Sequence, residues 1–255
     1  MSAKFASIQE AMASGETLAM AHRGAMASAP MNTMAAFELA IEQGADAIEL
    51  DVQRSSDGHA VIAHDFSVDA TTDGSGPVAE KSLAELQELD AGSWFSSGFS
   101  GERIPTLDQV FASLGGGTLF NVEIKSGHQG SGNIEEQVAA CVRRYSMANR
   151  VVISSFDPYV LLNFRLLMPT VMTGFLYDPA LPSKYFIPLK KLSHEARHPR
   201  HDMVDEVYMR WARQNDYYVN TWTVNERERA VELQRLGVNA IISDDPEMLV
   251  DALSS

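Results

Sequence analysis

The sequence of 255 residues contains one cysteine, Cys141, which excludes an internal disulfide. Cys141 lies in the segment EEQVAACVRRY at an apolar helical spacing. We therefore expect a small buried side chain, because a reactive thiol needs a positively charged, partly open setting. Such sparing use of cysteine is typical of a reducing compartment, and a cytoplasmic location is expected.

Basic residues are also few. The chain has 20 lysines and arginines against 34 aspartates and glutamates, which gives a net charge of −14 at pH 7. An acidic surface repels nucleic acid and anionic lipid headgroups, so neither is expected as a partner. An anionic small-molecule substrate would need a local cluster of positive charge. No feature of the sequence indicates an oligomeric state.

Long hydrophobic runs, linkers and low-complexity tracts are missing as well. Gln9, Glu10 and Glu16 interrupt the apolar residues near the N-terminus, so we expect no signal peptide, no membrane span and no stable membrane insertion. With 45% hydrophobic and 21% charged residues, the composition is that of an ordinary globular protein. We expect a single domain over residues 1–255, a length at which α/β barrels form one unit.

Short apolar runs alternate along the chain with longer amphipathic stretches. The apolar runs predict strands and the amphipathic stretches predict helices. The expected strands are TLAMAHR, AIELDVQ, TLFNVEIK, RVVISSF, TVMTGFLY, YYVNTWTV, NAIISDD and, with the weakest pattern, EARHP. Helices are expected at 34–43, 134–148, 158–168, 204–214, 226–236 and from Pro246 onward.

Strands that alternate with helices imply a parallel sheet. If the extended run HAVIAHD is an excursion and not a sheet strand, eight strand–helix units remain, and they favour an α/β TIM (β/α)8 barrel. The alternative is a doubly wound open sheet. It would favour a glycine-rich phosphate turn after the first strand, and HRGAMASAP does not have the GxGxxG pattern.

Polar and aromatic side chains gather where the predicted strands end. They are His22, Arg23, His64, Asp65, Trp222, Asn225, Asp244 and Asp245. Active sites of parallel barrels form at the carboxyl ends of the strands, so these residues are expected near one another. Trp222 is equally consistent with a plain core position. The other histidines are expected at the surface or as caps; they are His59, His128, His194, His198 and His201.

Three carboxylates occupy strands of this predicted barrel. Glu49 and Asp51 lie two residues apart, so their side chains share one face, and Glu123 has the same spacing to Lys125. A Glu-x-Asp pair is most often a solvated strand face, but apolar neighbours such as Ile48 and Leu50 indicate a buried strand. Buried carboxylates need a partner or a metal, and an all-oxygen set suits Mg²⁺ or Ca²⁺.

Positive charge and titratable imidazoles accompany these carboxylates. Arg23 and Lys125 would supply the charge that a bound phosphate requires. His22 and His64 can take up and release protons near neutral pH. The combination predicts metal-assisted chemistry on a phosphate ester.

The same segments resemble the glycerophosphodiester phosphodiesterases. They are HRG, PMNTMAAFELAIEQGADAIELDVQRSSDGHAVIAHD, TTDGSG, SLAELQELDAGSWF, ERIPTLDQVF, NVEIK, WTVN and GVNAIISDDP, in order from His22 to Pro246. The resemblance implies a TIM barrel with an inserted segment at about 65–105 that caps the barrel mouth. It implies hydrolysis of substrates such as glycerophosphocholine or glycerophosphoethanolamine to glycerol 3-phosphate and an alcohol.

The resemblance also implies roles for single residues. His22 and His64 match the acid/base pair of the family. Its metal ligands, for one divalent cation, are matched by Glu49, Asp51 and Glu123. Its phosphate-binding residues are matched by Arg23 and Lys125, and a wall of its substrate pocket by Trp222.

One position departs from the family pattern. The family usually reads Pro-Glu-Asn-Thr after the first strand, and here Met31 replaces the glutamate. Asn32 and Thr33 remain, and they suit the N-cap of the next helix. The altered position leaves a non-catalytic binding relative as one alternative. A lysophospholipase D-like enzyme is another, with an apolar channel formed by Phe66, Trp94, Phe95 and Phe99.

Overall fold

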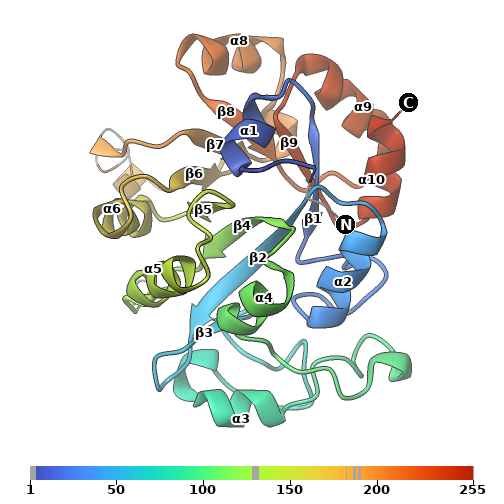
Figure 1. Ribbon diagram of the computed structural model, residues 1–255, viewed down its shortest axis with the longest axis vertical. Helices are drawn as coiled ribbons and strands as arrows, with labels where there is room; N and C mark the ends of the chain where they lie inside the picture. The colour runs from blue at the N-terminus through green and yellow to red at the C-terminus, as the bar shows by residue number, and fades with distance from the viewer. Residues whose placement is uncertain (1–3, 128–131, 182, 186–187, 189–190, 255) are drawn as a thin grey trace.

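The computed structural model describes residues 4–127, 132–181, 183–185, 188 and 191–254 (Figure 1). Its strands form one nine-stranded sheet in the order β1-β9-β8-β7-β6-β5-β4-β2-β3, with a further pairing of β1 and β2. The strands are β1 (Leu18–His22), β2 (Ala47–Arg54), β3 (Ala60–Ile62), β4 (Leu119–Ile124), β5 (Val151–Ser155), β6 (Met172–Tyr177), β7 (Ala196–Pro199), β8 (Tyr218–Thr221) and β9 (Ala240–Ser243).

The strands other than β3 pair in parallel and close into a barrel, because β1 pairs with both β2 and β9. The predicted TIM barrel is therefore confirmed. The weak run EARHP is the barrel strand β7. The run HAVIAHD contributes β3, which pairs antiparallel with β2 and stands outside the barrel, as expected.

The helices lie around the barrel, except for one at its amino end and one apart from it (Figure 1). They are α1 (Ile8–Ala13), α2 (Met34–Glu42), α3 (Leu83–Glu88), α4 (Leu107–Leu114), α5 (Ile134–Arg144), α6 (Pro158–Leu167), α8 (Glu206–Gln214), α9 (Arg227–Leu236) and α10 (Pro246–Leu253). Short 3₁₀ helices occur at Val78–Glu80, Ser97–Phe99, Ser183–Tyr185 and His201–Met203. In the described part of the chain, no helix has the length and apolar character needed to cross a bilayer.

Among the α-helices that the structure describes, three were not predicted, and one ends early. The sequence analysis assigned no helix to α1, α3 or α4. The helix expected at 134–148 ends at Arg144, because Ser146 adopts a left-handed backbone with φ of 56° and turns the chain toward β5. Cys141 on α5 is buried as expected, and burial together with Asp108 raises the pKa of its thiol to about 12.

The amino end of the barrel is filled by apolar side chains. Residues at the starts of the strands, among them Leu18, Leu119 and Val152, form one cluster with Ile8 and Met12 of α1. α1 thus packs against the ends of the strands where the barrel begins. Polar residues of the interior are left to the carboxyl ends, where the candidate site lies.

The chain between β3 and α4 forms an excursion that contains α3 (Figure 1). It has its own small apolar cluster, which includes Val68, Leu86 and Ile104. At its end the chain returns beside β3, where the Ile62 amide donates to the Pro105 carbonyl at 2.9 Å. The predicted boundaries of about 65–105 and the role of this segment as a cap stay predictions.

Candidate functional site

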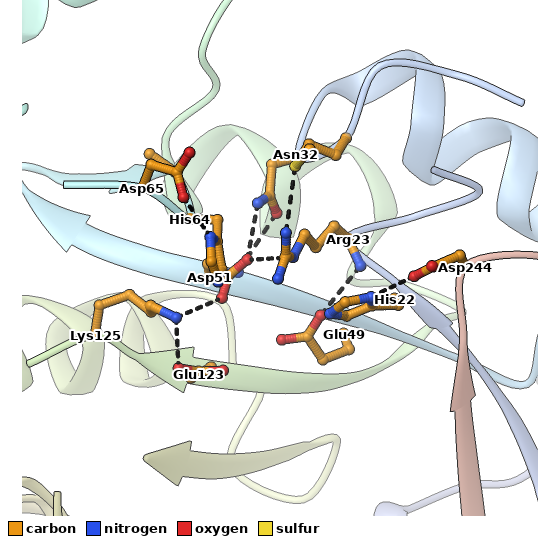
Figure 2. A network of polar contacts seen from close by, with 12 residues as sticks. His22, Arg23, Asn32, Glu49, Asp51, His64, Asp65, Glu123, Lys125 and Asp244 are labelled. Carbon is orange, nitrogen blue, oxygen red and sulfur yellow. Dashed lines mark hydrogen bonds and ion pairs between the residues drawn. The ribbon is translucent and has the colours of Figure 1, made fainter. Parts of the chain in front are cut away.

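The predicted residues from β1, β2 and β4 lie side by side where β1 and β4 end and beside the middle of the longer strand β2 (Figure 2). His22 at the end of β1 is in register with Glu49 on β2. Asp51, two residues further along β2, is in register with Glu123 on β4. The two-residue spacing therefore brings the side chains together by simple strand geometry.

Glu49, Asp51 and Glu123 form a buried carboxylate triad. They are 3%, 1% and 8% exposed, and each offers an oxygen within 4.8 Å of the oxygens of the others. Burial, followed by the charges of Asp51 and Glu123, raises the pKa of Glu49 well above its ordinary value. Burial also raises the pKa of Glu123. Negative charge is therefore concentrated where solvent cannot stabilise it.

Two cations face the triad. The Lys125 ammonium lies 2.8 Å from Glu123 Oε1 and 3.4 Å from Asp51 Oδ1, and Arg23 Nε lies 3.2 Å from Asp51 Oδ2. Burial alone would raise the pKa of Asp51, but the charges of Lys125 and Arg23 outweigh it and hold that pKa below its ordinary value. Burial would lower the pKa of Lys125, yet Glu123 and Asp51 raise it. Lys125 therefore keeps its positive charge.

Each of the two predicted acid/base histidines contacts a carboxylate through Nδ1. His22 Nδ1 lies 2.5 Å from Asp244 Oδ1, and His64 Nδ1 lies 2.7 Å from Asp65 Oδ1 (Figure 2). Burial, with the nearby charges of Lys125 and Arg23, lowers the pKa of His64. Because Nδ1 of each ring is engaged, Nε2 is the nitrogen left for a bound molecule.

These residues surround one cavity of about 140 Å³. Its polar lining consists of His22, Arg23, Glu49, His64, Asn121, Glu123, Lys125 and Thr223. Its apolar lining consists of Phe156, Leu176, Trp222 and Ile242. The rings of Phe156 and Trp222 meet edge to face at 5.4 Å, and the Trp222 indole donates to the His198 carbonyl at 2.8 Å. Of the residues with a predicted catalytic, cation-binding, phosphate-binding or pocket-wall role, all except the deeply buried Asp51 line this cavity. The other candidates at strand ends do not line it; they are Asp65, Asn225, Asp244 and Asp245.

The loop after β1 contributes differently from the prediction. Thr33 alone caps α2, accepting from the Ala36 amide. Asn32 is turned toward Asp51 instead: its Nδ2 donates to Asp51 Oδ2 at 2.9 Å, and its Oδ1 accepts from the Asp51 amide. The expectation that Asn32 shares in the cap was wrong, because its left-handed backbone, with φ of 59°, directs the side chain inward. Asn32, part of the motif that the sequence analysis singled out after the first strand, thus contacts the carboxylate triad, and this contact was not predicted.

Met31 also faces the site. The Arg23 guanidinium donates from Nη1 to the Met31 sulfur at 3.4 Å. A thioether is a weak, uncharged acceptor, so this contact does not neutralise the positive charge of Arg23.

Two of the remaining histidines are not on the surface. His198 is 0% exposed and His194 is 7% exposed, so the surface expectation was wrong for both. The side chain of His198, on β7, is directed inward, and Asn220 Nδ2 donates to its Nε2 at 3.0 Å. His59 is exposed as expected, and His128 lies outside the described residues.

Comparison with known proteins gives one consistent result. The sequence profile described as "Glycerophosphoryl diester phosphodiesterase family" matches residues 22–248. The chain is 40% identical over 237 residues to a glycerophosphodiester phosphodiesterase of Caldanaerobacter subterraneus subsp. tengcongensis, covering 92% of this chain and 97% of that one.

Solved structures agree. An Oleispira antarctica phosphodiesterase in complex with the product sn-glycerol-3-phosphate has a TM-score of 0.84 and 31% identity, covering 96% of this chain and 99% of that one. A glycerophosphodiester phosphodiesterase from Agrobacterium tumefaciens has a TM-score of 0.79 and 28% identity, covering 94% of this chain and 100% of that one.

Proposed function

Because the chain belongs to the glycerophosphoryl diester phosphodiesterase family, we propose that it hydrolyses glycerophosphodiesters to glycerol 3-phosphate and an alcohol with the help of a divalent cation. Glycerophosphocholine and glycerophosphoethanolamine are the proposed substrates. One observation carries the proposal: a carboxylate triad, two cations and two carboxylate-bound histidines converge on a single cavity.

Glu49, Asp51 and Glu123 are the proposed cation ligands. The fit rests on their oxygen-only donor set and on their burial, since the raised pKa values of Glu49 and Glu123 reflect charge that a cation would neutralise. A cation bound here supplies positive charge to the phosphate oxygens. We propose Mg²⁺ or Ca²⁺, which both prefer oxygen ligands.

Arg23 and Lys125 are the proposed phosphate-binding residues. Both line the cavity, and each is held by carboxylates of the triad, so their charged groups are positioned before substrate arrives. Their donors bind the non-bridging oxygens and offset the charge that develops on them during reaction. Trp222, with Phe156, forms an apolar wall against the carbon skeleton of the glycerol.

His22 and His64 are the proposed proton-transfer pair. One imidazole Nε2 takes the proton of the attacking hydroxyl, while the other protonated imidazole gives its proton to the alcohol oxygen as the phosphorus–oxygen bond breaks. Two nucleophiles fit this scheme. Water gives glycerol 3-phosphate directly, whereas the glycerol 2-hydroxyl gives a cyclic phosphate that water then opens. Turnover of the isolated cyclic phosphate tests the second route.

The cavity favours a small substrate over a lysophospholipid. Its volume of about 140 Å³ offers space for a small group such as glycerophosphate. Three of the aromatic residues that would have formed an acyl channel pack on one another. The ring centroid of Phe95 lies 5.8 Å from that of Trp94 and 5.7 Å from that of Phe99. We propose a cytoplasmic location, which agrees with the free thiol of Cys141.

The experiment that tests this function measures glycerol 3-phosphate release from both substrates with Mg²⁺, Ca²⁺ or EDTA. We expect cation-dependent release by the native chain and a loss of about 10²–10⁴-fold in His22→Ala. His59→Ala, a change at an exposed histidine that does not line the cavity, is the matched control and should keep native activity. Release that is unaffected by EDTA, or an active His22→Ala variant, contradicts the proposed site.

A further inference from the structure

The carboxylate of Asp244 connects His22 to a residue of the neighbouring loop. Asp244 Oδ1 lies 2.5 Å from His22 Nδ1, and Asp244 Oδ2 accepts from Asn225 Nδ2 at 2.6 Å. The three residues follow or end β1, β9 and β8, which are adjacent in the barrel. A chain of hydrogen bonds therefore runs across three neighbouring strand ends.

The Asn225 side chain also contacts the backbone of Asp244. Its Oδ1 accepts from the Asp244 amide at 3.0 Å and from the Ser243 hydroxyl at 3.2 Å. One planar amide thus donates to the Asp244 side chain and accepts from its backbone. Only a side chain with a donor and an acceptor at this spacing does both, which excludes aspartate and alanine as equivalents.

The contact between Asn225 and Asp244 matters because the Asp244 side chain is only partly buried. Its side chain is 27% exposed, so solvent competes for its oxygens and alternative rotamers are open to it. The hydrogen bond from Asn225 Nδ2 restricts the carboxylate to the orientation that meets His22, and the bond from the Asp244 amide to Asn225 Oδ1 fixes the backbone that carries it. Partners beyond the groups that touch a ligand set the orientation of the groups that do.

The loop that carries Asn225 is anchored without it. Val224 is 1% exposed, and its amide donates to the Ile242 carbonyl at 3.0 Å. Asn225 itself is exposed, and neither it nor Asp244 is among the residues that line the cavity. Loss of the Asn225 side chain should therefore leave the loop in place and release Asp244.

We propose that Asn225 is a positioning residue, which acts through Asp244 to hold the His22 ring with Nδ1 occupied and Nε2 directed into the cavity. The proposal rests on the proposed function only in giving His22 a part in proton transfer. It specifies the consequence of losing Asn225: the transition state is affected more than substrate binding, because Asn225 does not line the cavity.

Two substitutions and a matched control test the proposal by kinetics. Asn225→Ala removes all three side-chain hydrogen bonds, and Asn225→Asp keeps the acceptor but places a second negative charge beside Asp244. We expect kcat to fall by about 10- to 100-fold in both variants, with KM changed less than about threefold. The control is Asn215→Ala, at an exposed asparagine that donates to the Trp211 carbonyl in the turn before β8. It should retain native kcat.

A measurement on the free protein separates this proposal from the proposed function. In ¹⁵N-histidine-labelled protein, the His22 Nδ1 proton should give a downfield resonance, identified by its loss in His22→Ala. We expect this resonance to move or vanish in Asn225→Ala and to persist in Asn215→Ala, with both variants folded by circular dichroism. An unchanged resonance, or a native kcat in Asn225→Ala, overturns the proposal. If the native chain releases no glycerol 3-phosphate, the proposed function fails while the resonance still decides the role of Asn225.

Discussion

The ammonium nitrogen of Lys125 lies 2.8 Å from Oε1 of Glu123, so a proposed phosphate-binding residue is bound to a proposed cation ligand. Lys125 also reaches Asp51, at 3.4 Å from Oδ1. The carboxylates thus face two sources of positive charge, the lysine and a divalent cation. Repulsion between these sources should weaken cation binding.

Replacement of Lys125 by methionine should therefore strengthen cation binding and weaken phosphate binding. We expect the Kd for Mg²⁺ or Ca²⁺ to fall by up to about tenfold, equivalent to ~1.4 kcal/mol, because a like charge is removed. Glycerol 3-phosphate should bind more weakly to the same variant. Isothermal titration calorimetry measures both, and weaker cation binding by Lys125→Met would contradict the shared-carboxylate arrangement.

Glutamine at position 49 should stabilise the metal-free protein at neutral pH. The pKa of Glu49 is raised on folding, so its favourable contribution is complete below the ordinary value of 4.5 and is lost as the pH rises. In EDTA at pH 7, we expect Glu49→Gln to have a Tm about 2–4 °C above that of the native chain, with the difference vanishing near pH 4.

Addition of Mg²⁺ or Ca²⁺ should reverse the order of the two Tm values, since only the native chain keeps all three carboxylates of the triad. Glu38→Gln, at an exposed position of α2, is the control and should follow the native curve. A Tm for Glu49→Gln below the native value in EDTA at pH 7 would show that Glu49 does not carry unfavourable charge.

The buried histidines should make the fold sensitive to acid. Burial lowers the pKa of His198 to about 3 and that of His194 to about 4, against an ordinary value of 6.5. Below pH 6.5 the unfolded chain binds protons that the folded chain does not, so stability is full above that pH and falls as the pH approaches 3–4. Each histidine steepens the decline by at most about 1.4 kcal/mol per pH unit.

Urea unfolding at several pH values between 7 and 4.5 measures this slope. We expect a shallower slope for His198→Gln, whatever its stability at pH 7, and an unchanged slope for His59→Gln, whose side chain is exposed. Equal slopes for His198→Gln and the native chain would mean that His198 is protonated in the folded state.

A carboxylate at position 31 should compete with the substrate phosphate for the Arg23 guanidinium. Met31→Glu would replace the weak sulfur acceptor, now 3.4 Å from Nη1, with a charged one. We expect KM for glycerophosphocholine to rise about threefold with kcat little changed, because a neutralised guanidinium attracts phosphate less. Met31→Leu keeps the side chain uncharged and should behave as the native chain; equal KM values for all three proteins would remove Met31 from the site.

The barrel was predictable because the apolar periodicity of each element and the alternation of strands with helices are both visible in the sequence. Alternating runs located the strands, although β7 was faint since His198 and Arg197 interrupt its apolar residues. Helices α3 and α4, which were not predicted, begin with capping boxes, Ser82 with Glu85 and Thr106 with Gln109. These pairs are visible in the sequence, but apolar periodicity does not reveal them. α1 has only six residues, too few for a periodic pattern.

The site was predictable only in part, for a different reason. The triad follows from two-residue spacing and strand register, which a sequence contains. The Asp244 contact joins residues 222 positions apart, and it depends on closure of the barrel between β1 and β9 and on one side-chain rotamer. Asn32 depends on a left-handed backbone in a loop. Neither property leaves a pattern in the amino-acid order.

The excursion between β3 and α4 leaves and returns at neighbouring points of β3, which pairs with the barrel strand β2, since Val61 pairs with Thr106 and Ile62 donates to Pro105. Its ends are therefore fixed by the barrel and not by its own length. Doubling a flexible segment between fixed ends costs only about 0.6 kcal/mol of closure entropy. A change in the length of this excursion should therefore cost the barrel little closure entropy when the apolar cluster of Val68, Leu86 and Ile104 is kept.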